Sequence, residues 1–194
     1  MSALEALKGE RVHTRSIRIE TFAVDDDRVI VEGTLEDTRA GVINTISGLR
    51  REPGMAHGMV VRFLVGGMPV KILDVEVEMR QVPLEECPQA ASSVKRLIGM
   101  HIVYGYSKAV KEQLGGAKGC THLTNLILSM GSAAIQGMAA LRGREPIPPD
   151  ARAMMIQYVK NSCMVWREGG PQIQKAMQEV KKASESKPQK TAPD

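Results

Sequence analysis

The sequence has few aromatic residues, few cysteines and no long apolar run. Aromatic side chains make up 3% of the 194 residues, whereas there are 12 Met, so an aliphatic and adaptable core is expected. No segment reaches the roughly 18 apolar residues that cross a bilayer, and no membrane partner is expected. The three cysteines form no even disulfide framework, and residues 1–10 lack the apolar stretch of a secretory signal. A reduced, cytoplasmic protein is therefore expected.

The charge of the chain is moderately basic, with a net charge of +4. Part of the excess lies in lysines near the C-terminus, and few aromatic side chains are present to stack on bases. Nucleic acid is therefore not expected as a partner. The length predicts a single domain over residues 1–184, and residues 185–194, which lack apolar anchors, are expected to be a disordered tail.

The first half of the chain, from about residue 12 to residue 80, has the alternation of β-strands. Apolar residues alternate with polar ones in 15–20 and 28–35, on either side of an acidic turn at 25–27. The same pattern occurs in 59–65 and 73–79, around a glycine and proline turn. Two N-terminal hairpins of one antiparallel sheet are predicted.

The second half, from about residue 88 to residue 183, has helical periodicity. Helices are predicted over 89–98, 102–114, 121–141, 151–166 and a last segment through 182. The predicted fold class is α+β, with the C-terminal helices packed on the sheet. Exposed strand edges and Met-rich helices also favour a homodimer or other homo-oligomer.

The segment from Gly119 to Leu123 is the strongest candidate for a functional site. Three glycines at 115, 116 and 119 precede Cys120, and Thr121 is expected to cap the long helix. The positive end of that helix favours a thiolate at Cys120 and can bind an anion through Gly119 and Thr121. Its ordinary alternative is a small buried cysteine, a capping threonine and a histidine bonded to the loop.

Two chemistries are open for Cys120 and His122. Together with Cys87 and His57 they would form a tetrahedral site for zinc or another transition metal, although their spacing is that of no zinc finger. Alternatively, Cys120 is a nucleophile, His57 or His122 is its base, and Asp37 orients the base. Asp37 also follows a predicted strand end, where capping a turn is its ordinary role.

Tyr106 is a further candidate for ligand binding, in a segment that runs from Gly99 through Gly105 to Tyr106 and Ser107. Its hydroxyl can orient a substrate, whereas its ordinary role is packing between helix and sheet.

Several short motifs of this chain occur in the same order as in a known protein family. The matching residues are Leu35 with Asp37-Thr38-Arg39, Met55-Ala56-His57-Gly58-Met59, Pro83 with Cys87, Gly99 through Gly105-Tyr106, and Gly119-Cys120-Thr121-His122-Leu123. From His13 to Gln136 the chain resembles a family of uncharacterised bacterial proteins, domain of unknown function 2889. In the family that the chain resembles, the histidine at the position of His57 is followed by an aspartate. This chain has Gly58 there, which weakens His57 as a base. The resemblance indicates where a site lies and implies no reaction.

Two classes of function follow. In the first, the chain is a metal-dependent or thiol-dependent enzyme that acts on a small anionic substrate through Cys120, His122 and His57. In the second, it is a non-catalytic protein that binds a small molecule or serves as a subunit of an assembly.

Overall fold

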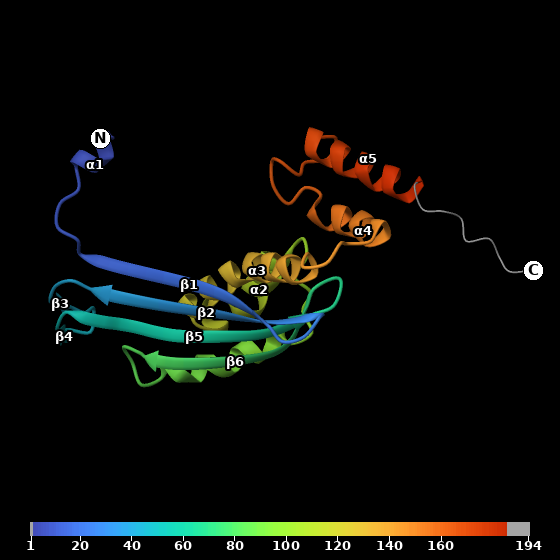
Figure 1. The fold of residues 1–194 in the computed structure, drawn as a ribbon. Helices are drawn as coiled ribbons and strands as arrows, with labels where there is room; N and C mark the ends of the chain where they lie inside the picture. Colours follow the sequence, from blue (N-terminus) through green and yellow to red (C-terminus); the bar gives the residue numbers. More distant parts are fainter. Residues whose placement is uncertain (1, 186–194) are drawn as a thin grey trace, which may run out of the picture. The chain divides into compact units, whose positions relative to one another are not determined.

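The computed structural model describes residues 2–185 and contains a four-stranded sheet, with helices of residues 87–138 on one of its faces (Figure 1). The strands are β1 (His13–Ala23), β2 (Arg28–Arg39), β3 (Ile43–Asn44), β4 (Arg50–Arg51), β5 (Gly54–Gly66) and β6 (Lys71–Gln81). The helices are α1 (Ala3–Ala6), the 3-10 helices η1 (Cys87–Leu97) and η2 (Gly116–Lys118), α2 (Tyr106–Leu114), α3 (Thr121–Arg142), α4 (Pro149–Val159) and α5 (Pro171–Glu185).

The long strands pair in the order β1-β2-β5-β6, and every neighbouring pair is antiparallel. The hairpins β1-β2 and β5-β6 are the two predicted from the alternation, and β2 lies beside β5 at the centre of the sheet. β3 and β4 form a separate two-stranded ladder. The predicted α+β class, with N-terminal hairpins and C-terminal helices, is confirmed.

The two faces of the sheet differ in chemistry. Leu35, Met59 and Phe63 are buried on the face that meets the helices. On the opposite face, Arg62 of β5 lies between Glu32 of β2 and Glu78 of β6, with Nε 2.6 Å from Glu32 and an ion pair to Glu78. One face therefore packs, and the other carries charges in water.

Close contact between α3 and the sheet depends on a glycine of β2. A Cβ added to Gly33 would lie 2.9 Å from the Met130 sulfur and 3.0 Å from a methyl group of Leu126. Met130 and Leu126 are both completely buried. Because Gly33 has no side chain, α3 crosses β2 closely enough to bring its first turn to the sheet.

Several predicted boundaries differ from the structure for local reasons. The segment after Cys87 is a 3-10 helix, and α2 begins at Tyr106 instead of residue 102, because Gly105 has a left-handed backbone with φ of 89°. The fourth helix ends at Val159 instead of residue 166, and Asn161 just beyond it has φ of 61°. Both left-handed residues interrupt a right-handed helix.

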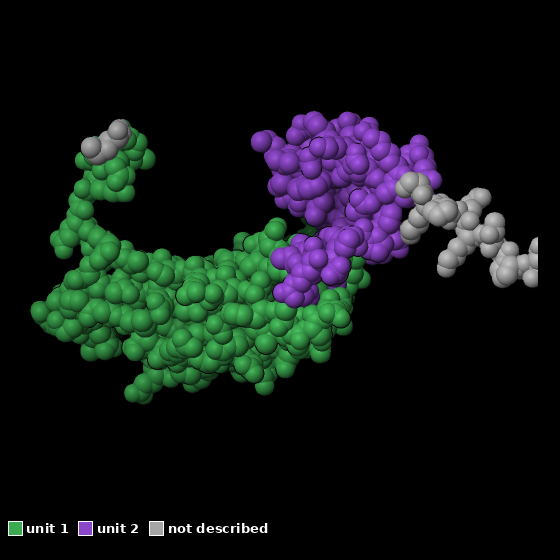
Figure 2. All heavy atoms as spheres, viewed as in Figure 1, with its two compact units in different colours: residues 1–138 green, residues 139–194 purple. Residues whose placement is uncertain are grey.

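Two compact units divide the chain, residues 1–138 and residues 139–194 (Figure 2). The first contains the sheet and most of α3, and the second contains α4 and α5. The single domain expected over residues 1–184 stays a prediction, and the expected disordered tail lies outside the described residues except for Glu185, which ends α5.

None of the helices in residues 2–185 combines the length and the apolar character that a membrane crossing requires.

Candidate functional site

The site begins as a row of three side chains across three neighbouring strands. Asp37 of β2 lies opposite Arg15 of β1 and opposite His57 of β5. The alternation of β2 places Asp37 on the same face as Leu35, toward the helices. The strand continues to Arg39, so the expectation that Asp37 caps a turn is wrong. A register shift between Asp37 and Thr38 leaves Ala56 as an extra residue on β5, just before His57.

Asp37 is held by a two-pronged contact with Arg15. Arg15 donates from Nε to Oδ1 and from Nη2 to Oδ2, and both donor–acceptor distances are 2.7 Å. The Asp37 side chain is only 3% exposed. The hydrogen bonds from Arg15 lower the pKa of Asp37 although burial opposes them, so the carboxylate is ionised at neutral pH.

Two histidine rings lie against the same carboxylate oxygen. Oδ2 of Asp37 is 3.2 Å from His57 Nδ1 and 3.5 Å from His122 Nε2. The rings are stacked, with centroids 3.8 Å apart. His122 belongs to the first turn of α3, so the site joins the sheet to the helix layer. A third ring, that of His13, lies 3.3 Å from the other oxygen, Oδ1.

The contact between His57 and Asp37 is close, but it is not a hydrogen bond. Nδ1 of His57 is buried and has no well-aligned hydrogen-bond partner in the part of the chain that the structure describes. The distance of 3.2 Å still brings the carboxylate close enough to act on the charge of the ring.

Both stacked histidines are neutral at pH 7. Burial is the main cause that lowers the pKa of His57, and the positive charges of Arg15 and Arg39 add to it. Burial also lowers the pKa of His122, followed by the charges of His57 and Arg15. Asp37 opposes both shifts without reversing them. Neutral rings keep a lone pair for a proton or a metal.

Cys120 contacts the second nitrogen of His122. Its Sγ lies 3.6 Å from Nδ1, while Nε2 of the same ring faces Asp37. The backbone N–H of Thr124 bonds to the carbonyl of Cys120, so Cys120 and not Thr121 precedes the helix as its cap. The two-residue spacing allows the contact because Cys120 is outside the helix.

Cys87 lines the same hollow as Cys120 and does not belong to the cluster of histidines. A hollow of about 270 Å³ is lined by Cys87, Cys120 and Gly119, together with Leu84, Glu86 and Ala90. Among the described residues, the cluster with three ligand-bearing side chains close enough for a metal is Asp37, His57 and His122. Cys87 and Cys120 are outside it, so their role as ligands stays a prediction.

Tyr106 has a structural contact in place of an open hydroxyl. The hydroxyl of Tyr106 donates to the carbonyl of Ile127 at a distance of 3.0 Å, and burial raises the pKa of this hydroxyl above its ordinary value. The ring packs against Gly131 of α3.

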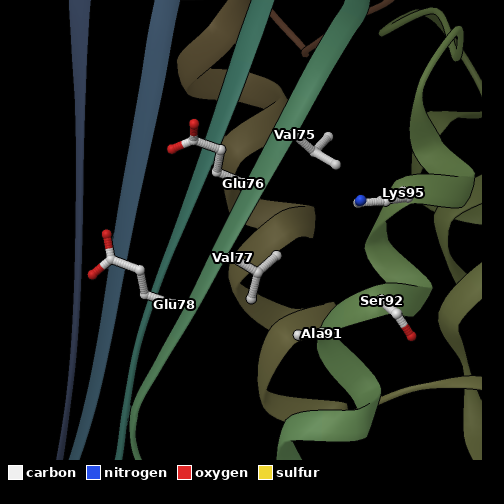
Figure 3. Close-up of a pocket in the computed structure, with 7 residues that line it drawn as sticks. All are labelled: Val75, Glu76, Val77, Glu78, Ala91, Ser92 and Lys95. Atoms are coloured by element: carbon white, nitrogen blue, oxygen red, sulfur yellow. The ribbon is translucent and has the colours of Figure 1, made fainter.

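A larger hollow of about 430 Å³ lies between β6 and η1 (Figure 3). In Figure 3, Val75 and Val77 point toward η1, whereas Glu76 and Glu78 point away from it. Its lining contains none of the residues around Asp37.

Three residues at the site were not among the candidates from the sequence, namely His13, Arg15 and Arg39. Arg15 could have been found by counting from the acidic turn at 25–27, because residues equally far from a hairpin turn face each other across the two strands. Arg15 lies 11 residues before Asp26 and Asp37 lies 11 residues after it, and the two pair in the structure. His13 and Arg39 follow from the same register, since they also face each other.

The comparisons with known proteins give a family and no reaction. The model of the family described as "Protein of unknown function (DUF2889)" matches residues 13–136, which is more than half of the chain. The chain therefore belongs to this family. No curated protein and no solved structure matches the chain significantly. All the residues of the cluster around Asp37 lie within the matched segment.

Proposed function

We propose that this protein binds a divalent transition metal, zinc or a close relative, through Asp37, His57 and His122, and uses it on a small-molecule substrate. The convergence of three ligand atoms within 4.8 Å of one another supports the proposal. Two nitrogens and one carboxylate oxygen form a common set for zinc and for iron, in which other coordination positions stay open.

The spacing of the donor atoms agrees with a shared metal. Ligands at about 2.0–2.2 Å from a tetrahedral ion lie roughly 3.3–3.6 Å from one another. The Asp37 oxygen is 3.2 Å from the His57 nitrogen and 3.5 Å from the His122 nitrogen. Oδ2 has two lone pairs, so the hydrogen bond from Arg15 leaves one of them for the ion.

The contacts of His57 and Asp37 also agree with a bound metal. Nδ1 of His57 lies 3.2 Å from the carboxylate of Asp37 without a hydrogen bond between them, and a cation bound to both atoms would account for that approach. Arg15 fixes the plane of the carboxylate. Metal ligands are commonly oriented in this way by residues that hydrogen-bond to them without binding the metal. A bound ion would supply a Lewis acid and an activated water.

Metal analysis of the purified protein tests this directly. We expect about one equivalent of zinc, iron or a similar ion per chain, and a tenfold or greater loss of zinc affinity in Asp37→Asn, His57→Gln and His122→Gln. His101→Gln, which changes an exposed histidine outside the cluster, is the matched control. If the wild-type chain binds no ion, or the three variants bind zinc as it does, the proposal is wrong.

Thiol chemistry at Cys120 is a second candidate, favoured by one observation. Cys120, His122 and Asp37 form a continuous chain, with Sγ 3.6 Å from one ring nitrogen and the carboxylate 3.5 Å from the other. In this arrangement His122 accepts the thiol proton and Asp37 stabilises the resulting imidazolium.

Alkylation of the metal-free chain distinguishes this candidate. We expect iodoacetamide to modify Cys120 faster than the exposed Cys163, and we expect His122→Gln to abolish the difference. Equal rates at the two cysteines in the wild-type chain would count against thiol catalysis, whether or not a metal binds.

A further inference from the structure

Arg39 lies beside the site, and one nitrogen of its guanidinium is buried. Its Nε is buried and has no hydrogen-bond partner in residues 2–185. Three buried side-chain nitrogens in that part of the chain share this condition, and two of them, Arg39 Nε and His57 Nδ1, belong to residues around Asp37. Nε of an arginine is always a donor, and a buried donor without an acceptor costs free energy, so Arg39 indicates a place for a group that supplies an acceptor.

The register of the strands places Arg39 beside the proposed metal ligands. It lies two residues after Asp37, on the same face of β2, and pairs with His13 of β1. His13, the residue opposite Arg39, has its Nε2 3.3 Å from Oδ1 of Asp37, so the pair of His13 and Arg39 borders that carboxylate.

The charges of the site favour an anion. Asp37 is neutralised by Arg15 through both carboxylate oxygens, and a histidine that binds a metal is neutral. Arg39 then remains as a positive charge, to which a divalent metal would add two more. The first turn of α3 also begins here, at Thr121, and the positive end of a helix attracts anions.

We propose that Arg39 binds an oxyanion of the substrate, a carboxylate or a phosphate, beside the metal held by Asp37, His57 and His122. The inference rests on the proposed function and names the substrate class for the same site. The planar guanidinium donates to the oxyanion from Nε and a terminal nitrogen, in the fork that suits two oxygens. Arg39 is a binding residue for the substrate and not a metal ligand.

Calorimetric titration of the zinc-loaded chain with acetate and, separately, with methyl phosphate tests the inference at constant ionic strength. We expect one of these probes to bind in one equivalent, and the stronger one identifies the oxyanion. Loss of a charged hydrogen bond should weaken that binding by about 10- to 100-fold in Arg39→Gln. Arg18→Gln is the matched control, because Arg18 has the same charge on an exposed side chain of β1.

The two proposals fail separately. Arg39→Gln should bind zinc as the wild-type chain does, because Arg39 supplies no ligand. If zinc binds normally and neither probe binds, or Arg39→Gln binds the probe as tightly as Arg18→Gln, the oxyanion site is wrong and the metal site stands. If zinc does not bind to the wild-type chain, the proposed function itself is wrong.

A second variant covers the case in which Arg39→Gln does not fold. Arg39→Lys keeps the positive charge and loses the planar fork, so probe binding should still weaken. Unchanged probe affinity in Arg39→Lys would overturn the two-pronged contact.

Discussion

Asp37 shows how one residue can organise its surroundings through its neighbours across a sheet. Its carboxylate is almost completely buried, yet it has Arg15 on one strand, His57 on the next and His122 on a helix. A buried carboxylate with that many partners is ionised, because the hydrogen bonds from Arg15 outweigh the cost of burial. The residue after His57 is Gly58, which has no acidic side chain, and Asp37 supplies a carboxylate to the ring of His57 from the neighbouring strand.

The stability of the metal-free chain should fall as the pH drops below about 6.5, the ordinary pKa of histidine. Burial lowers the pKa of His57 and His122 in the folded chain, so the unfolded chain binds more protons in that range. The loss begins near the unfolded value and is complete below the folded one. Asp37 does not contribute there, because its own pKa is lowered from 3.8.

Urea unfolding at pH 7.5, 6.5 and 5.5 measures this dependence. The double variant His57→Gln with His122→Gln should show a smaller decrease between these pH values than the wild-type chain, and His101→Gln should not. An equal decrease in the double variant would place the responsible protons elsewhere.

At the scale of elements, the packing of α2 on α3 depends on the absence of a side chain at Gly131. A Cβ at that position would overlap the ring of Tyr106, which is fixed by its hydrogen bond to Ile127. Alanine normally stabilises a helix by about 1 kcal/mol relative to glycine, whereas an overlap in a packed core costs roughly 1–3 kcal/mol. We expect the overlap to dominate.

Gly131→Ala should therefore lower the free energy of unfolding, by up to about 2 kcal/mol, in denaturant titrations. Gly41→Ala is the control, because a Cβ there has no heavy atom within 4 Å. A variant of Gly131 as stable as the wild-type chain would show that Tyr106 moves aside easily.

The elements also show what the sequence can and cannot predict. Alternation in 28–35 and 59–65 is strong because one face packs and the other meets water, and both hairpins followed from it. Arg15 and Asp37 were harder to connect, because alternation gives the face of a residue but not its partner across the sheet. The end of the helix before Asn161 depends on a single left-handed residue, and asparagine only sometimes adopts that conformation.

At the scale of the whole molecule, all the proposed site residues belong to one of the two compact units. Asp37, His57, His122 and Arg39 lie in residues 1–138, and the segment that matches the family lies there too. The second unit supplies no ligand in either proposal. The homo-oligomer expected from the strand edges stays a prediction, and light scattering of the purified chain measures it.

A chain that ends at Arg142, the last residue of α3, should fold and bind zinc with the affinity of the full chain. Circular dichroism and zinc titration of this shorter chain measure both properties. A folded product with lost affinity would mean that residues 143–194 contribute to the metal site.

The stacking of His57 on His122 has a consequence for the order in which the chain assembles. The two rings are 65 residues apart in the sequence, as 122 minus 57 gives, and they meet only when α3 has docked on β2 and β5. Bringing such distant segments together is slow, because the entropy of closing the intervening loop is lost first. A metal held by both rings would act as a removable cross-link, formed late in folding and opened by a chelator without breaking a covalent bond.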